Sequence, residues 1–116
     1  MNSLKNRVQL IGHLGVDPEL KNLDSGKHLT KFSLATNDGY KNDKGEFVKE
    51  TQWHNVVAWG KLADNMSNLL KKGSYVAISG KLSHRNWEDK DGVKRYATDV
   101  VAGDFVKLTP KEEAPF

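Results

Sequence analysis

The sequence predicts an all-β protein, a five-stranded Greek-key barrel with one short helix between the third and fourth strands. Apolar and polar residues alternate at every second position over most of the chain, which is the pattern of half-buried strands. Polar stretches rich in Gly, Asn and Asp separate these runs and predict turns. One segment instead repeats its apolar residues at helical spacing. The chain has 116 residues, which suits one domain over residues 1–108 and a short tail over residues 109–116.

Three strands are expected before the helix. The apolar face of the first strand consists of Val8, Leu10, Gly12 and Leu14. Pro18 ends this run because its nitrogen cannot donate a hydrogen bond to a continuing ladder. Residues 32–36 alternate as a second strand, and the polar stretch 37–46, with two glycines, predicts a hairpin tip. A third strand covers about residues 49–59.

The helix and the last two strands follow. The apolar stripe of the helix is Leu62, Met66, Leu69 and Leu70. Gly73 suits the left-handed residue that ends a helix. The fourth strand has an apolar face of Val76, Ile78 and Leu82. Residues 88–92 read as a turn, and a fifth strand runs from about residue 95 to 108. This order of strands and helix matches the OB-fold.

Side chains that commonly catalyse reactions or hold metals are absent or unsuitably spaced. The chain has no cysteine, which excludes disulfides, thiolate zinc sites and cysteine nucleophiles. Its four histidines never stand at metal-ligand spacing. Gly60-Lys61 and Gly80-Lys81 lack the upstream glycine and the Ser or Thr of a phosphate-binding loop. We therefore expect no enzyme activity, no cofactor and no metal site.

The charge of the chain permits an anionic partner without requiring one. Lys and Arg number 18 against 15 acidic residues, for a net charge of +3 and a pI near 9.1. No apolar run approaches the roughly 18 residues of a membrane span, and the first residues show no targeting segment. We expect a cytoplasmic protein without membrane contact.

Four aromatic residues indicate a ligand. Trp53 and Trp59 share one face of the third strand, and that pair alone favours burial in the core and binding of a flat ligand about equally. Trp87 stands beside Arg85 near the tip of a polar hairpin, where burial is hard to arrange, and Tyr40 has a similar place in the other long loop. Exposed aromatics among cations stack unpaired bases of any sequence, at roughly 1–3 kcal/mol per base. The pattern therefore predicts a surface for single-stranded nucleic acid.

Basic residues are the expected phosphate contacts. The candidates are Arg7, Lys49, Lys61, Lys72 and Arg85. A solvated surface explains any single lysine among them equally simply, whereas Arg85 beside Trp87 favours a phosphate contact. His54 lies on the other face of the third strand, with Val56 and Ala58. A packed histidine or a subunit contact explains His54 better than catalysis.

Several stretches of the chain resemble the bacterial single-stranded DNA-binding protein family. The most specific is QWHNVVAWGKLA at residues 52–63. The stretches NRV, LIGHLG, DPE and FSLAT precede it, and LKKGS, ISGKL and RNW follow it in order. The resemblance covers about residues 4–108.

The resemblance implies an OB-fold, usually a homotetramer, that wraps single-stranded DNA without sequence preference and without a catalytic step. It implies a role in replication, recombination and repair, close to the nucleoid. The positions that match the base-stacking aromatics are Tyr40, Trp53, Trp59 and Trp87. The positions that match basic residues along the DNA path are Arg7, Lys61, Lys72 and Arg85. His54 matches a histidine at the subunit interface, and Asn55 and Asn86 replace commonly basic residues, which weakens phosphate contacts locally.

The last residues, 111–116, resemble the partner-recruiting tip of the same family. Glu112 and Glu113 would meet a basic pocket, and Pro115 and Phe116 would anchor replication and repair proteins. A frayed tail without a role also explains so short a segment.

Two other classes of function compete with DNA binding. One is an OB-fold primosomal accessory protein, expected as a dimer, that acts mainly through protein contacts. The other is a metal-dependent nuclease on the same barrel, which would need clustered carboxylates that the sequence does not assemble.

Overall fold

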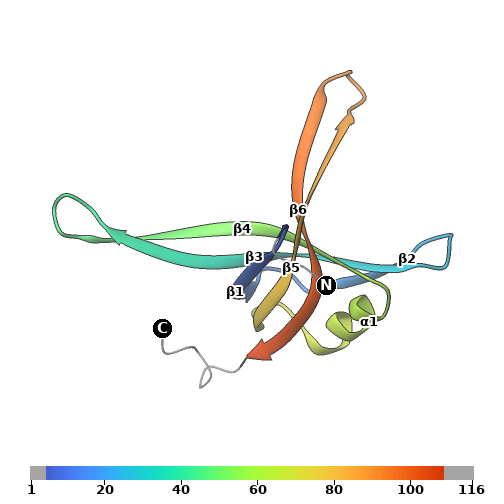
Figure 1. Cartoon of the computed structure of the whole chain (residues 1–116), viewed down its shortest axis with the longest axis horizontal. Coiled ribbons are helices and arrows are strands. Elements are labelled where there is room, and N and C mark those ends of the chain that lie inside the picture. Colours follow the sequence, from blue (N-terminus) through green and yellow to red (C-terminus); the bar gives the residue numbers. More distant parts are fainter. Residues whose placement is uncertain (1–4, 109–116) are drawn as a thin grey trace.

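A computed structural model describes residues 5–108 of the chain. Its elements are the strands β1 (Val8–Leu14), β2 (Glu19–Asn22), β3 (His28–Lys41) and β4 (Phe47–Trp59), the helix α1 (Gly60–Leu69), and the strands β5 (Tyr75–Glu88) and β6 (Lys94–Leu108). Strands β1, β3, β4, β5 and β6 form a closed barrel, and α1 lies at one end of it (Figure 1). The predicted five-stranded barrel with one helix before the fourth barrel strand is confirmed.

Two sets of pairings close the barrel. β1 pairs antiparallel with β5 along most of its length and with β3 at its end. On the opposite side, β4 runs parallel to β6 over residues 55–57 and 99–101. Gly12 lies where β1 approaches β3, and a Cβ there would collide with the carbonyl of Ala35. Glycine at this position therefore lets β1 contact both of its neighbours.

Strand β2 is an addition that the sequence did not predict. It pairs antiparallel with the start of β3 at the edge of the sheet. All four of its side chains are exposed, so no apolar alternation marks it in the sequence. β2 extends the sheet beside β3 without entering the barrel.

The core is built by inward-facing residues of the barrel strands and of α1. Its most deeply buried members are Leu34, Val56, Val76, Ile78 and Met66. Leu82 was predicted on the same face as Val76 but is 40% exposed. It follows a register shift between Ser79 and Gly80, beyond which β5 leaves the core.

Helix α1 is held to the core by Met66, which is completely buried. Leu69 from the predicted stripe is exposed, since the helix ends there. Gly73 has the predicted left-handed backbone, with φ of +89°, but it lies in the following turn, because the helix is already capped by the extended Leu70. The N–H of Gly73 donates to the carbonyl of Leu14 (2.8 Å) and so joins this turn to β1.

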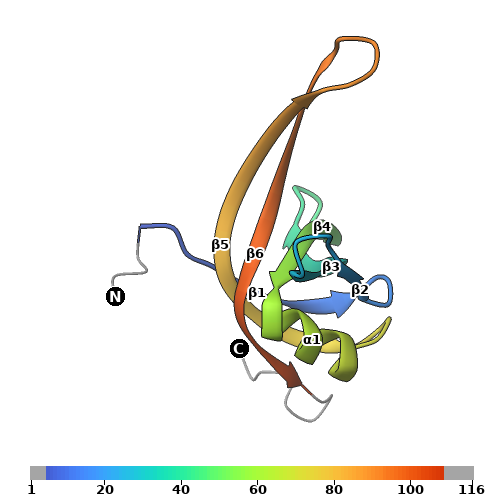
Figure 2. The same ribbon diagram turned by 90° about the vertical axis from the view of Figure 1, so that its right-hand side faces the viewer.

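Two long two-stranded arms extend beyond the barrel, the β3–β4 arm and the β5–β6 arm, and they project in different directions (Figures 1 and 2). Asn42 and Asp89 each use one side-chain oxygen to accept two backbone N–H groups of the turn at the tip. The first tip lies between Lys41 and Phe47. The loop predicted over residues 37–46 is therefore too long, and Tyr40 lies on strand β3 rather than in a loop.

Asp89 is the charged counterpart of Asn42. The backbone N–H of Val93 lowers the pKa of the Asp89 carboxyl, partial desolvation opposes this, and Arg95 and the N–H of Asp91 lower the pKa further. Nε of Arg95 lies 3.0 Å from the Asp89 carboxylate. These bonds favour the ionised form of Asp89 in the folded arm.

We predict that acid loosens the tip of the β5–β6 arm. Because the pKa of Asp89 is lower in the folded chain, its contribution to stability is present above its ordinary pKa of 3.8 and is lost as the pH falls through the lowered value. The amide resonance of Val93 should therefore shift between about pH 5 and pH 2. In the variant Asp89→Asn, which reproduces the uncharged Asn42 tip, this shift should disappear. Its persistence in the variant would contradict the assignment to Asp89.

Candidate nucleic-acid interface

Trp53 and Trp59 project from the outer face of β4. Trp53 is 62% and Trp59 45% exposed, whereas Val56 and Ala58 on the other face are completely buried. Successive side chains of a strand point to opposite faces, so the predicted common face of the two indoles is confirmed. The alternative that both indoles belong to the core is wrong.

The Trp53 indole lies over a glycine. Gly15, just after β1, donates its N–H to the carbonyl of Ser33 (2.9 Å). A Cβ on Gly15 would lie 2.5 Å from Cζ3 of Trp53 and 2.7 Å from Oγ of Ser33. The missing side chain therefore leaves the space that one edge of the indole occupies.

Arg85 lies between Trp87 and an acidic residue on β5–β6. Its Cζ is 5.1 Å from the centre of the Trp87 ring, a distance typical of a cation–π contact. Its Nε donates to Oδ2 of Asp99 at 2.6 Å, and the Asp99 side chain is only 10% exposed. The guanidinium is thus oriented by a charge-assisted hydrogen bond.

The strand register brings all three tryptophans to one side of the sheet. Ser83 of β5 pairs with Asp99 of β6, which pairs in parallel with Asn55 of β4. Paired residues share a face, and the same face recurs at every second residue, so Trp87 lies on the same side as the two tryptophans of β4. We call this surface the tryptophan face; its residues are Trp53, Asn55, Trp59, Ser83, Arg85, Trp87 and Asp99.

Tyr40 does not belong to the tryptophan face. It is 51% exposed and pairs with Val48, which places it on the opposite side of the β3–β4 arm from Trp53. The structure therefore separates Tyr40 from the aromatic residues with which the sequence grouped it.

Phe47 is an exposed aromatic residue that sequence reasoning missed. It is 63% exposed, it lies on the Trp53 side of β4, and a Cβ on Gly39 would collide with its ring. The sequence prediction began this strand at about residue 49, because the residues before Phe47 are polar, whereas β4 begins at Phe47. Extending the alternation of the strand two residues toward the N-terminus would have found it.

The predicted basic residues are all exposed but lie on separate elements. Their positions are Arg7 before β1, Lys49 on β4, Lys61 at the start of α1, Lys72 in the turn after α1, and Arg85 on β5. By register, Lys49 and Arg85 lie on the side of the tryptophans. The backbone N–H of Lys72 donates to the carboxylate of Asp17 (2.6 Å), which holds that turn beside the end of β1.

His54 is half-buried on the face of β4 opposite the tryptophans. Its Nε2 lies 2.9 Å from Oγ1 of Thr36 on the neighbouring strand. This contact fits the expectation of a packed histidine. The predicted tail residues Glu112, Glu113, Pro115 and Phe116 lie outside the described residues.

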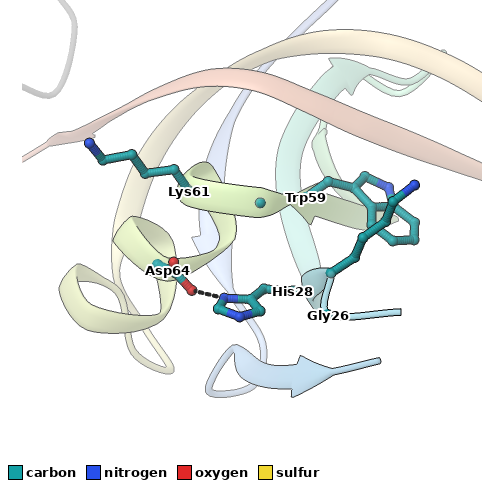
Figure 3. A pocket seen from close by; sticks show the side chains of 7 residues that line it. Gly26, His28, Trp59, Lys61 and Asp64 are labelled. Carbon is teal, nitrogen blue, oxygen red and sulfur yellow. Dashed lines mark hydrogen bonds and ion pairs between the residues drawn. The ribbon is translucent and has the colours of Figure 1, made fainter. Parts of the chain in front are cut away.

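A pocket of about 760 Å³ opens beside Trp59, between the β2–β3 turn, the end of β4 and the start of α1. Its lining residues are Gly26, Lys27, His28, Trp59, Gly60, Lys61 and Asp64. Figure 3 shows His28 turned toward Asp64, with Nδ1 2.8 Å from Oδ1, and the Trp59 indole on the other side of the pocket. The His28–Asp64 pair joins β3 to α1.

Residues 5–108 contain neither a metal-binding cluster nor a membrane-spanning helix. In this part of the chain, no three His, Cys, Asp or Glu side chains are grouped so that they could hold a metal ion. No helix formed by these residues is long and apolar enough to cross a membrane.

Curated proteins of similar sequence carry one common description. "Single-stranded DNA-binding protein 1" of Chlorobaculum tepidum is 49% identical over 108 residues, which cover 92% of this chain and 67% of that protein. The protein of the same name from Xylella fastidiosa is 41% identical over 109 residues, 93% of this chain and 80% of that protein.

Solved structures with the same fold are similar as well. A Plasmodium falciparum SSB in complex with ssDNA has a TM-score of 0.85 and 30% identity, over 94% of this chain and 98% of that chain. A deletion mutant of the single-stranded DNA binding protein from Thermus aquaticus has a TM-score of 0.80 and 29% identity, over 91% of this chain and 51% of that chain. The model of the single-strand binding protein family matches residues 5–108, the whole of the described fold. This chain therefore belongs to the single-strand binding protein family.

Proposed function

We propose that this chain binds single-stranded DNA without sequence preference and protects it during replication, recombination and repair. Family membership supports single-stranded DNA binding over the alternative of a primosomal accessory protein. The observation that carries the mechanism is the tryptophan face, on which three exposed indoles lie along paired strands and one has an arginine over its ring.

Bases stack on Trp53, Trp59 and Trp87 in this proposal. Every base has a π-face, so stacking tolerates any sequence. Trp53 and Trp59 are six residues apart on one strand, or about 20 Å, so they contact different nucleotides. Tyr40 contacts a strand that has passed over the edge of the β3–β4 arm, since it lies on the other side.

The phosphates meet the basic residues around these indoles. Arg85 and Lys49 act on the side of the tryptophans, and Lys61 acts at the start of α1. Arg7 and Lys72 act near the barrel, away from the arm tips. Cations that neutralise phosphates release bound counterions, so affinity depends on salt. The proposed role of these residues is binding, and we assign no catalytic step to them.

We also propose a homotetramer. Ile11, Ala77 and Val106 are neighbours in register on the outer side of β1, β5 and β6, and Val106 is 56% exposed. An apolar surface of this kind suits contact with a second copy of the chain. We propose four subunits of 13.0 kDa each, with His54 at a second contact between subunits. A native mass of two subunits would contradict this.

The tail is proposed to recruit replication and repair proteins. Glu112 and Glu113 would approach a basic surface, and Pro115 with Phe116 would fill an apolar pocket. Binding of a helicase or nuclease partner, measured before and after removal of residues 115–116, tests this role. We propose that the chain acts at the nucleoid, in the cytoplasm.

We predict that oligo-dT quenches the tryptophan fluorescence and that duplex DNA of equal length binds much more weakly. The indoles need unpaired bases for stacking, which a duplex does not offer. The logarithm of affinity should fall linearly with the logarithm of salt concentration, at about −0.7 per phosphate neutralised. Equal affinity for duplex and single strand would refute the proposed function.

We predict that Trp53→Ala and Trp87→Ala each weaken oligo-dT binding by about 1–3 kcal/mol, the magnitude of one stacked base. The matched control is Leu69→Ala, because Leu69 is also exposed but lies at the end of α1. Affinities from fluorescence anisotropy of labelled oligo-dT measure the effect. If the tryptophan variants bind like the control, the indoles have only a structural role.

We predict that Gly15→Ala weakens binding by displacing the Trp53 indole. The new Cβ would lie 2.5 Å from that ring, so the ring or the loop must shift. Gly103→Ala is the control, since its Cβ would meet only the Ser79 carbonyl at 3.7 Å. Quenching by oligo-dT should fall for the first variant alone. Equal quenching in both would show that the position of Trp53 does not matter for binding.

A further inference from the structure

We propose that the pocket beside Trp59 is a subsite for one nucleotide of the bound strand. In this subsite the base lies against Trp59, and Lys27 and His28 contact its phosphate. The inference rests on the proposed function. It extends the DNA contact from the tryptophan face to the turn between β2 and β3, a region in which the sequence indicated no DNA contact.

The size and shape of the pocket suit a nucleotide. Its volume of about 760 Å³ lies within the usual range of small-ligand sites, about 300–1,000 Å³. The indole of Trp59, 45% exposed, provides a flat wall, and His28 with Asp64 provides the opposite one (Figure 3). A Cβ added to Gly26 or Gly60 would meet no atom within 4 Å, so the pocket is open at both glycines.

The charges of the pocket favour an anion. Lys27 and Lys61 line it together with a single acidic residue, Asp64. In Figure 3 the Lys61 side chain extends away from Trp59. Lys27, in the turn between β2 and β3, is therefore the lysine that we assign to the ligand. The carboxylate of Asp64 already accepts a hydrogen bond from His28 at 2.8 Å, and the two lysines outnumber this one acidic residue.

Asp64 positions His28 for a phosphate. An ionised carboxylate can only accept hydrogen bonds, so the Nδ1 of His28 that contacts it carries the proton. This leaves Nε2 as the ring nitrogen that can meet a ligand, and Nε2 donates to a phosphate oxygen when the ring carries both protons. His28 is the phosphate contact in this arrangement, and Asp64 is a positioning residue that also joins α1 to β3.

The test compares three variants by their affinity for oligo-dT. Lys27→Gln and His28→Gln should each weaken binding about two- to fivefold, as expected for an exposed charged contact. Lys27→Gln should also reduce the salt slope by about 0.7. Lys21→Gln is the matched control, because Lys21 is an exposed lysine of the same hairpin that does not line this pocket. The control should bind like the original chain.

A second measurement observes the subsite directly. The variant Trp53→Phe/Trp87→Phe retains Trp59 as the only one of the three tryptophans. Quenching of Trp59 by a dT dinucleotide should be stronger when the dinucleotide carries a 5′-phosphate. Addition of Lys27→Gln or His28→Gln should remove this difference.

Three results would overturn the subsite. Unchanged affinity for oligo-dT in both Lys27→Gln and His28→Gln would refute it. Equal weakening by Lys21→Gln would show a diffuse effect of charge. A lower melting temperature of His28→Gln with unchanged affinity would show that the His28–Asp64 pair only joins β3 to α1. Failure of the unmodified chain to bind oligo-dT would refute the proposed function itself.

Discussion

The parallel pairing of β4 with β6, over residues 55–57 and 99–101, is the contact on which the other features depend. On its inner side it sets Val56 beside Val100 in the core, and on its outer side it sets Asn55 beside Asp99. Both arms continue from the strands joined here, so the pairing also decides which of their faces are continuous. A register slip of one residue in either strand would turn its outer side chains inward.

The electrostatics of the outer surface follow from the same pairing. Asp99 is nearly buried at this junction, and a carboxylate there requires a partner because burial without one is costly. Arg85 is that partner, and its guanidinium lies over the Trp87 ring. The closure of the barrel thus determines where Asp99 lies, Asp99 orients Arg85, and Arg85 covers one side of Trp87. Two charged side chains, Asp99 and Arg85, are thus enough to hold a cation over the Trp87 indole.

Local patterns predicted the five barrel strands, the helix and the common face of Trp53 and Trp59, because side chains alternate along a strand. The pattern of that pair did not decide whether the face is buried or exposed, which the structure shows. β2 escaped prediction because all of its side chains are exposed. The separation of Tyr40 from the tryptophans depends on pairing register, and the His28–Asp64 contact joins residues far apart in the chain. Such features follow from non-local pairing, which a local pattern does not encode.

The construction of the arms explains why their exposed side chains include large aromatic residues. A two-stranded ribbon has no second layer and is marginally stable alone in water. Beyond the barrel, the β5–β6 arm relies on the Asp89 turn and on Arg85 over Trp87, and the β3–β4 arm on the ring of Phe47 over Gly39. Side chains that stabilise the arms are therefore also those that offer flat surfaces. In the proposed mechanism, a base stacked on such a surface would supply the packing that the ribbon lacks, and the same indole would serve the arm and its ligand.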